Sequence, residues 1–240
     1  MDNIKVAVIL AGGKGTRLGV MVKDIPKPLI DVKGKPLLVH LINHLKRCHI
    51  EKVILSLGYL SDVIKSYFDK NPISGINIVY VEESSEKPLG TGGPLGLVKD
   101  LVDGPFLVLN GDTLTDVDIN KIYRFHVQKR ALVTVAIKKV EDVSGLGCVK
   151  LSSDGRITEF IEKEEIRSVS NFVNIGVYVI EPDVINLIKK GVQVSLEKEI
   201  FPVIAKQGRL FGFKSDAQYF DIGTPERLEN ARKLWVPHTL

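Results

Sequence analysis

Apolar positions along the chain follow two different spacings, which predict alternating strands and helices. Continuous apolar runs typical of buried strands occupy residues 5–11, 52–58, 76–82 and 105–112. Residues 36–50 instead carry apolar side chains at helical spacing, beginning at Pro36. Residues 61–70 predict a second helix, which Ser61 is expected to cap. This alternation indicates an α/β fold with a mostly parallel central sheet and helices on both faces.

The second half of the chain has a different pattern. Residues 131–140 and 171–180 predict strands, and the Asp154-Gly155 turn between two alternating runs in 147–163 predicts a hairpin. Helices that begin at Ser195 and Thr224 are expected over 195–208 and 224–235. No linker composition separates the two halves, so we expect a single domain.

The composition is that of a globular protein and gives no sign of nucleic-acid binding, a disulfide framework or a membrane span. The chain has 240 residues, of which 44% are hydrophobic and 26% are charged, so a globular core is expected. A net charge of +4 is too small to indicate nucleic-acid binding but tolerates an anionic ligand. Cys48 and Cys148 are too far apart in sequence to suggest a disulfide framework or a zinc site. The apolar run before Gly12 is too short to span a membrane, so we expect a cytoplasmic protein without a membrane partner.

A glycine-rich segment, 11–19, follows the first predicted strand. Ligands of α/β sheets bind beyond such strand ends, and glycine lets the backbone approach a phosphate closely. Lys14 and Arg17 add a point charge and a planar fork, so the segment predicts a polyphosphate site. It is no Walker A loop, because Lys14 precedes Gly15, and no dinucleotide fingerprint, because Leu18 replaces the third glycine. A glycine-rich turn with two solvated charges is the alternative.

Lys27, which lies between two prolines, is a further candidate for a functional cation. Pro26 and Pro28 restrict the backbone on either side of Lys27, which suits a charge that must be held in one place. The alternative is a surface lysine in a proline-rich loop.

Seven motifs in order resemble the sugar-1-phosphate nucleotidyltransferases, also called nucleotide-sugar pyrophosphorylases. They are LAGGKGTRL (10–18), IPKPL (25–29), LGTGGPL (89–95), LNGDTL (109–114), IEK (161–163), NIGVYVI (174–180) and FDIGTPERL (220–228). The branch they resemble is that of the mannose-1-phosphate and D-glycero-D-manno-heptose 1-phosphate guanylyltransferases. The resemblance implies a Rossmann-like, GT-A-like fold, with a nucleotide-binding half at about 1–130 and a sugar-binding half with a small β subregion at about 131–240.

The resemblance implies transfer of a nucleotidyl group from an NTP to a sugar 1-phosphate, giving an NDP-sugar and pyrophosphate. GTP with a heptose or mannose 1-phosphate is favoured, and Mg²⁺ is the implied cofactor. The alternatives are a uridylyl-, cytidylyl- or adenylyltransferase for another sugar 1-phosphate, a transferase for a polyol or choline phosphate, and a catalytically silent regulatory subunit that binds nucleotide sugars. Arg17, Lys27, Asp112 and Asp221 are all present, which favours the active enzyme. A homo-oligomer is compatible with the sequence.

The same resemblance assigns roles to individual residues. Arg17 and Lys27 are the implied catalytic cations, one for the departing pyrophosphate and one for the α-phosphate and sugar phosphate. Asp112 and Asp221 are the implied metal ligands. The nucleotide would contact Leu10, Ala11, Gly12, Gly13, Lys14, Gly15, Thr16, Arg17, Gly90 and Thr91. The sugar phosphate would contact Lys27, Asn110, Gly147, Glu162, Lys163 and Asn174. Longer family members carry a left-handed β-helix after this domain, and we expect none in a sequence that ends soon after 224–235.

Overall fold

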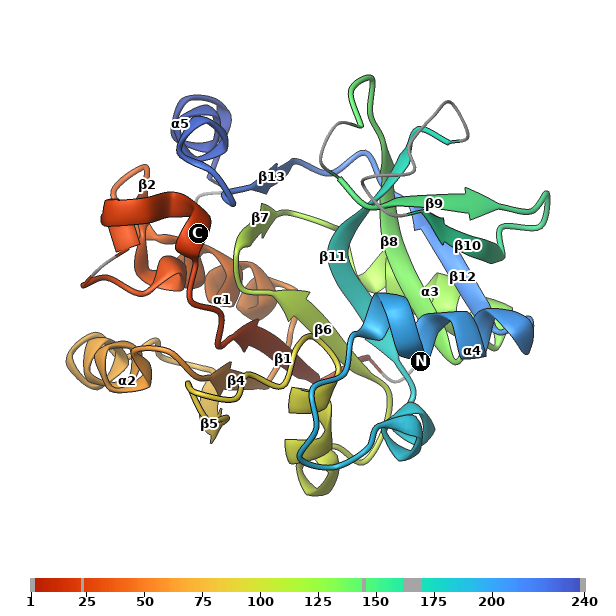
Figure 1. Cartoon of the computed structure of the whole chain (residues 1–240), viewed down its shortest axis with the longest axis horizontal. Coiled ribbons are helices and arrows are strands. Elements are labelled where there is room, and N and C mark those ends of the chain that lie inside the picture. The colour runs from red at the N-terminus through yellow and green to blue at the C-terminus, as the bar shows by residue number, and fades with distance from the viewer. Residues whose placement is uncertain (1–2, 23, 144–145, 162–169, 238–240) are drawn as a thin grey trace. The chain divides into compact units, whose positions relative to one another are not determined.

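The computed structural model describes residues 3–22, 24–143, 146–161 and 170–237 (Figure 1). Two compact units make up the chain, and each is named here after one of its strands. The β1 unit consists of Lys5–Pro88, Leu109–Asp116 and Gln218–Leu240. The β8 unit consists of Met1–Ile4, Leu89–Val108 and Val117–Ala217. Each unit is therefore assembled from segments that are distant in sequence.

The β1 unit has a parallel ladder at its centre. Its strands are β1 (Val6–Ala11), β2 (Asp31–Val32), β3 (Lys35–Pro36), β4 (Lys52–Leu57), β5 (Asn77–Glu82), β7 (Thr113–Thr115) and β13 (Tyr219–Asp221). Its helices are α1 (Leu37–Arg47), α2 (Ser61–Lys70) and α5 (Pro225–Leu234), with 3-10 segments η1 (Thr16–Val22) and η2 (Lys27–Leu29). β4 pairs in parallel with β1 on one side and with β5 on the other. The three predicted strands thus form a parallel sheet.

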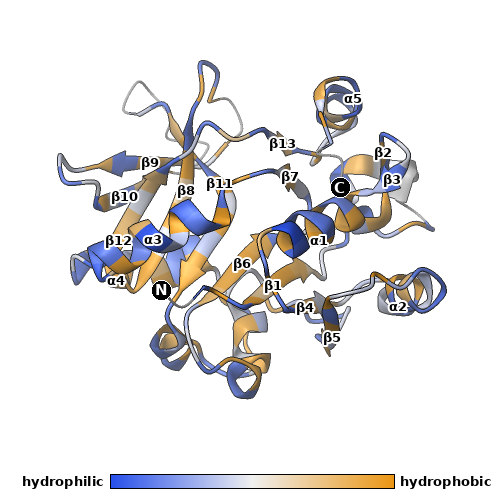
Figure 2. Ribbon diagram, turned by 180° about the vertical axis from the view of Figure 1, so that it is seen from behind, coloured by the Kyte–Doolittle hydropathy of each residue, from blue (hydrophilic) through white to orange (hydrophobic). Residues whose placement is uncertain are grey.

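Burial in this unit follows the spacing of apolar residues. Ala7, Val8 and Ile9 of β1 are all fully buried, as expected for a central parallel strand. In α1, Leu38, Leu41, Ile42 and Leu45 recur at helical spacing and are at most 1% exposed. Burying each such side chain contributes about 1.5–3 kcal/mol before the cost of ordering the chain. Figure 2 shows the apolar colouring of β1.

The start of α2 differs from the prediction. The expectation that Ser61 caps this helix was wrong, because Ser61 is its first residue and the preceding Leu60 takes a left-handed conformation with φ 56°. The Ser61 hydroxyl instead donates to the Glu82 carboxylate, 3.0 Å away at the end of β5. Ser61 therefore lies one position too late to cap the helix, and its hydroxyl bonds the end of β5 instead.

The β8 unit is mainly antiparallel. Its strands are β8 (Val133–Lys139), β9 (Cys148–Leu151), β10 (Ile157–Ile161), β11 (Phe172–Ile180) and β12 (Leu210–Lys214), and β6 (Phe106–Asn110) begins here and ends in the β1 unit. Its helical segments are η3 (Gly93–Leu97), η4 (Lys99–Leu101), α3 (Ile119–Lys129), η5 (Pro182–Leu187), the π-helical η6 (Leu196–Ile200) and α4 (Phe201–Lys206). β11 pairs antiparallel with β8 and β9, whereas β12 pairs in parallel with β8.

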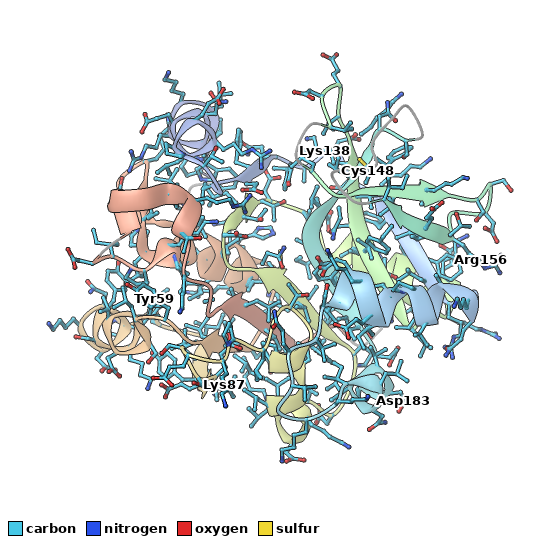
Figure 3. The ribbon with its side chains drawn as sticks, viewed as in Figure 1. Tyr59, Lys87, Lys138, Cys148, Arg156 and Asp183 are labelled. Atoms are coloured by element: carbon cyan, nitrogen blue, oxygen red, sulfur yellow. The ribbon has the colours of Figure 1, made fainter. Side chains whose placement is uncertain are left out.

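The predicted hairpin lies in this unit. β9 and β10 pair antiparallel, and Gly155 in the turn has φ 88°, a left-handed conformation that glycine adopts without strain. Cys148 at the start of β9 is buried, and Arg156 follows the turn (Figure 3). Both Cys48 and Cys148 are free thiols. Among the described residues, no helix combines the length and apolar character needed to cross a membrane.

Candidate active site

In the β1 unit, backbone segments that follow three strands approach one another very closely. The Gly111 amide donates to the carbonyl of Leu10 at 2.9 Å, and the Tyr59 amide donates to the carbonyl of Gly12 at 3.2 Å. A Cβ on Gly111 would lie 2.6 Å from the Leu10 oxygen, and a Cβ on Gly58 would lie 2.8 Å from the Gly12 oxygen. Glycine is therefore required here to bring the ends of β1, β4 and β6 together.

The glycine-rich segment extends from this junction towards the surface. Ala11 is buried, Leu10 and Gly12 are partly exposed, and Gly13, Lys14, Thr16 and Arg17 are exposed. Gly15 has φ 64°, and a Cβ there would lie 3.2 Å from the Cβ of Lys27. The exposed part of the segment offers backbone N–H groups and two cations, as a polyphosphate ligand needs.

Lys27 is a buried cation with a defined partner. Its side chain is only 8% exposed, and its Nζ lies 2.6 Å from Oδ2 of Asp112, whose side chain is 37% exposed. Pro26 precedes the short η2 segment in an extended conformation, and Pro28 lies inside it. The two prolines thus fix the backbone from which the ammonium reaches the carboxylate. Asn110 lies two residues before Asp112 at the end of β6 and is partly exposed.

Two short strands bring the predicted metal ligands together. β13 pairs antiparallel with β7, so Asp221 lies opposite Thr113, the residue after Asp112. The Ile222 amide donates to the carbonyl of Asp112 at 3.1 Å. The 109 positions between the two aspartates are therefore bridged by a three-residue ladder.

A second ion pair lies at Asp221. Its Oδ2 is 3.2 Å from Nη1 of Arg227, and the two side chains are 20% and 27% exposed respectively. An added Cβ on Gly223 would lie 2.6 Å from Asp221 Oδ1 and 3.2 Å from Arg17 Nη2. Gly223 thus leaves room for both the carboxylate and the Arg17 guanidinium. The charged cluster, meaning Arg17, Lys27, Asp112, Asp221 and Arg227, lies within the β1 unit.

The pKa of Tyr219 is raised by its burial and by the acidic members of this cluster. Burial raises the pKa of its phenol far above the ordinary value, and the negative charges of Asp221 and Asp112 raise it further, while Arg227 opposes them. The hydroxyl therefore stays protonated across the physiological range. It is a neutral group beside two carboxylates.

The carboxylate oxygens of the charged cluster are suitable ligands for a hard cation such as Mg²⁺ that also binds the substrate. Within the described residues, no group of three or more His, Cys, Asp or Glu side chains is placed to hold a metal. The backbones of Asp112 and Asp221 are adjacent, and both carboxylates act on Tyr219. Mg²⁺ is commonly held by one or two carboxylates together with phosphate oxygens and water. The residues present thus fit Mg²⁺ bound jointly with a polyphosphate.

The other predicted site residues lie in the β8 unit. Gly90 has φ 76°, and the Thr91 hydroxyl donates to the Glu197 carboxylate at 2.8 Å. The backbone N–H of Asn174 donates to the carbonyl of Gly147 at 3.0 Å, so these two predicted sugar-phosphate contacts are neighbours. Glu162 and Lys163 lie outside the described residues.

Three charged residues near the predicted site residues were not predicted from the sequence. Arg227 lies in the FDIGTPERL motif, but its pairing with Asp221 became visible only in the folded chain. Glu83 follows β5, and its Oε1 occupies the space that a Cβ on Gly12 would need. Glu197 lies in η6 and joins Thr91 to Tyr178. The contacts of Glu83 and Glu197 connect distant segments, so local spacing carried no signal for them.

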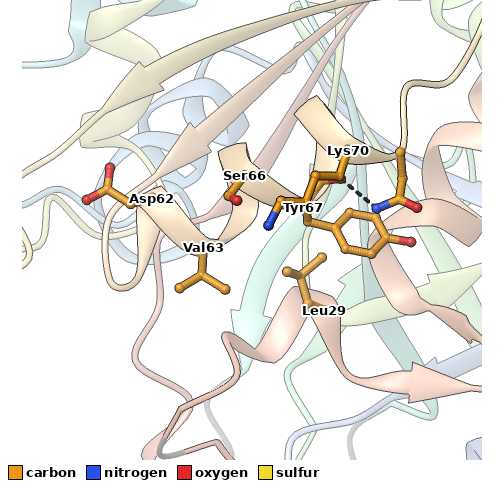
Figure 4. Close-up of a pocket in the computed structure, with 7 residues that line it drawn as sticks. Leu29, Asp62, Val63, Ser66, Tyr67 and Lys70 are labelled. Carbon is orange, nitrogen blue, oxygen red and sulfur yellow. Dashed lines mark hydrogen bonds between the residues drawn. The ribbon is translucent and has the colours of Figure 1, made fainter.

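An open pocket on α2 contains none of the predicted site residues. It has a volume of about 460 Å³ and is lined in part by Leu29, Val63 and Tyr67 (Figure 4). Asn71 also lines the pocket, and its side-chain Nδ2 donates to the Tyr67 carbonyl at 2.9 Å. His40 and His44, four residues apart on α1, are both buried, and His40 has structural partners: its Nε2 lies 2.8 Å from the Val32 oxygen and its ring packs against Trp235.

Known proteins resemble this chain over nearly its whole length. Residues 6–235 match the model of the nucleotidyl transferase family. The chain is 39% identical over 225 residues to mannose-1-phosphate guanyltransferase beta-B of Xenopus laevis, covering 92% of this chain and 61% of that protein. It is 38% identical over 223 residues to mannose-1-phosphate guanylyltransferase of Mycobacterium tuberculosis, with the same coverage. The chain thus spans about three fifths of the length of these curated relatives.

Solved structures agree with the sequence matches. The crystal structure of HddC from Yersinia pseudotuberculosis superposes with a TM-score of 0.84 at 29% identity, covering 96% of this chain and 99% of that one. HddC complexed with GMP-PN superposes with a TM-score of 0.81 at 30% identity and the same coverage. The predicted α/β fold class with a mostly parallel central sheet is confirmed by these superpositions. On the match over residues 6–235, the chain belongs to the nucleotidyl transferase family.

Proposed function

We propose that the protein transfers a guanylyl group from GTP to mannose 1-phosphate or heptose 1-phosphate, releasing pyrophosphate. The observation that carries this proposal is the charged cluster of the β1 unit, which lies beside an exposed glycine-rich segment. The choice of GTP and of these sugars is supported by the names of the relatives and by the GMP-PN complex of HddC. Because guanosine triphosphate is made in the cytoplasm, we expect the protein to act there.

The reaction needs charge neutralisation more than proton transfer. An oxygen of the sugar 1-phosphate attacks the α-phosphorus of GTP, and the bond from that phosphorus to the β-phosphate oxygen breaks. The nucleophile is already an anion, so no base must remove a proton from it. The barrier arises because two polyanions must meet in line, and cations with fixed positions lower it.

The proposed roles follow from the positions of the cations. Arg17 and Lys14, on the exposed segment, would bind the triphosphate, with Arg17 stabilising the pyrophosphate that leaves. Lys27 is held by Asp112 at 2.6 Å and would neutralise the phosphates at the reacting phosphorus. Its burial and fixed partner mean that little reorganisation is needed during the reaction.

Asp112 and Asp221 would hold Mg²⁺ together with oxygens of the nucleotide. The bound ion would supply positive charge that neutralises the polyphosphate. In the free protein, the same carboxylates are paired with Lys27 and Arg227. These cations keep the two acids oriented before the substrates arrive.

A substrate matrix tests the function. Five nucleoside triphosphates are combined with a panel of sugar 1-phosphates in the presence of Mg²⁺, and pyrophosphate release is measured. We expect turnover with GTP and mannose or heptose 1-phosphate. The Asp112→Asn variant should lower kcat by at least about 100-fold, on the scale of losing one electrostatic contact to the transition state. Asp103→Asn, at an exposed carboxylate of the β8 unit, is the matched control and should leave kcat unchanged.

The results can contradict the proposal in three ways. Turnover with another triphosphate but not with GTP would replace the proposed nucleotide. Absence of pyrophosphate release with every pair would instead favour a silent subunit that binds nucleotide sugars. Near-normal activity of Asp112→Asn would show that the metal assignment is wrong.

A further inference from the structure

Glu197 is the centre of a hydrogen-bond network in the β8 unit. Its Oε2 accepts from the Thr91 hydroxyl at 2.8 Å and from the Ser195 hydroxyl at 3.1 Å. Its Oε1 accepts from the Tyr178 hydroxyl at 2.9 Å. One carboxylate thus connects the 89–94 loop, η6 and β11. Ion pairs within the β8 unit do not include this acid among the described residues, so hydroxyl donors stabilise its charge.

The branch through Tyr178 reaches Asn174. The Asn174 Nδ2 donates to the Tyr178 oxygen at 2.9 Å, and the Asn174 Oδ1 accepts from the Gly176 amide at 2.9 Å. Between Asn174 and Tyr178 the register of β11 against β8 shifts, and Gly176 has φ 71°. Such a bulge re-aims side chains on a strand. Here it lets residues four apart on β11 contact each other.

The charge of Glu197 fixes the direction of every hydrogen bond in this branch. A carboxylate can only accept, so the Tyr178 hydroxyl must donate its one proton to Glu197. The Tyr178 oxygen is then left to accept, and it selects the Nδ2 side of the Asn174 amide. This leaves Asn174 with one side-chain amide proton and one lone pair, in a defined orientation, that bond none of the described residues.

Tyr178 is the buried member of this network, whereas Glu197, Thr91 and Asn174 are partly exposed. The Tyr178 side chain is fully buried and packs against Phe201, with ring centroids 5.3 Å apart. Leaving its hydroxyl without an acceptor would incur the full desolvation penalty of the group. The native pairing is therefore strongly preferred over alternatives in which Tyr178 turns away.

The branch through Thr91 fixes the 89–94 loop to the chain before η6. The Thr91 oxygen also accepts from the Leu196 amide at 2.9 Å. Backbone bonds join Gly92 N to the Val194 oxygen at 2.8 Å and Val194 N to the Leu89 oxygen at 2.9 Å. A Cβ on Gly90 would lie 2.5 Å from the Val194 oxygen, so the loop packs directly on this segment.

We propose that Glu197 is a positioning residue that orients two subsites at once, the 89–94 loop for the nucleotide and the Asn174 amide for the sugar phosphate. This inference rests on the proposed function and on the expectation from the sequence that Gly90 and Thr91 contact the nucleotide and Asn174 contacts the sugar phosphate. Glu197 itself touches neither substrate. Its carboxylate acts through Thr91 on one side and through Tyr178 on the other.

Steady-state kinetics with GTP and the preferred sugar 1-phosphate test the proposal. Glu197→Gln keeps the shape of the side chain but replaces one acceptor oxygen by a donor, so we expect the KM for both substrates to rise by about tenfold. Thr91→Val should raise the KM for GTP alone. Tyr178→Phe should raise the KM for the sugar 1-phosphate alone. This separation would not result from a general loss of stability, which would lower the active fraction and leave both KM values unchanged.

Glu199→Gln is the matched control. Glu199 lies in the same η6 segment, is exposed, and accepts from the Ser195 amide at 2.8 Å without contacting Thr91 or Tyr178. It should retain both KM values of the unmodified protein.

The outcomes separate the two proposals. If the unmodified protein turns over and Glu197→Gln has unchanged KM values, the positioning role is refuted while the enzyme function stands. If Thr91→Val and Tyr178→Phe each raise both KM values equally, the two-branch account is also wrong. If the unmodified protein releases no pyrophosphate with any substrate pair, the proposed function fails and this role fails with it.

Discussion

At the scale of single residues, Lys27 and Arg227 are the cations paired with the two aspartates that we propose as metal ligands. A buried cation is costly unless a partner compensates it, and Lys27 has Asp112 at 2.6 Å. Arg227 pairs with Asp221 at 3.2 Å in a less buried setting. Each carboxylate is therefore already paired with a basic side chain. A divalent ion that binds both carboxylates must compete with Lys27 and Arg227.

This competition predicts the effect of Arg227→Gln on metal binding. Removing the guanidinium leaves Asp221 with more uncompensated negative charge, so we expect the free protein to bind Mn²⁺ several-fold more tightly. The magnitude follows from the ~0.2–1 kcal/mol typical of an accessible ion pair. Electron paramagnetic resonance titration of Mn²⁺, without substrates, measures this directly.

Arg232→Gln is the control for that titration. Arg232 lies on the same helix, and its Nη1 pairs with Glu229 at 2.6 Å rather than with a predicted metal ligand. Its substitution should leave Mn²⁺ affinity unchanged. Weaker binding in Arg227→Gln would contradict the competition and would mean that Arg227 chiefly orients Asp221.

At the scale of elements, the start of α5 determines where Arg227 lies. Thr224 caps this helix: its hydroxyl oxygen accepts from the Arg227 amide at 3.3 Å, and Pro225 is the first helical residue. We expect Thr224→Ala to lower the free energy of unfolding by about 1 kcal/mol, the usual cost of losing such a cap. Urea denaturation followed by circular dichroism measures the loss.

Ser61→Ala provides the comparison. Ser61 is the first residue of α2 rather than its cap, and its hydroxyl donates to Glu82. Its removal should change stability by less than about 0.5 kcal/mol, as for most substitutions away from the core and from helix caps. Equal losses in the two variants would show that the Thr224 hydroxyl does not act as a cap.

Elements with a strong apolar pattern were predictable, and short ones were not. β1, β4 and β11 coincide with apolar runs of the sequence, because burial on both faces leaves a continuous signal. β5 also coincides with an apolar run, although its residues are only partly buried or exposed. β7 and β13 have three residues each, too few for any period to appear. Their pairing positions Asp221 beside Asp112, so the structure supplied the geometry of a site whose residues the sequence had named.

The contacts of Glu197 could not be predicted from the sequence either. Thr91 and Glu197 are 106 positions apart, and their hydrogen bond depends on how the β8 unit folds. A resemblance of motifs identified Thr91 and Asn174, because each lies in a segment that the family shares. The carboxylate that joins them lies in a segment without such a motif, so the sequence offered no reason to select it.

At the scale of the whole molecule, two buried histidines make stability depend on pH. Burial lowers the pKa of His126 below its ordinary 6.5, although Glu181 opposes the shift. Burial also lowers the pKa of His40, against the effect of the Val32 carbonyl. Both groups bind protons more readily in the unfolded chain, so their contribution to stability is present above pH 6.5 and is lost as the pH falls below it.

We therefore expect the melting temperature to fall between pH 7.5 and pH 5.5. The free energy of unfolding should change by up to about 1.4 kcal/mol per pH unit for each proton taken up on unfolding. His126→Gln should be less stable at pH 7.5 but should show a smaller decrease on acidification. His49→Asn, at an exposed position with φ 64°, should keep the slope of the unmodified protein. Identical slopes for all three proteins would refute the role of His126.

The interleaving of the two units has a consequence for genetic dissection. The chain passes from one unit to the other after Ile4, Pro88, Val108, Asp116 and Ala217. A gene cut near codon 130 would give two fragments, each with parts of both units, and would separate Asp112 from Asp221. Neither fragment could complete a core alone, so expressing them apart should yield insoluble polypeptides. Activity would return only if the fragments associate while they fold, as in split-protein complementation.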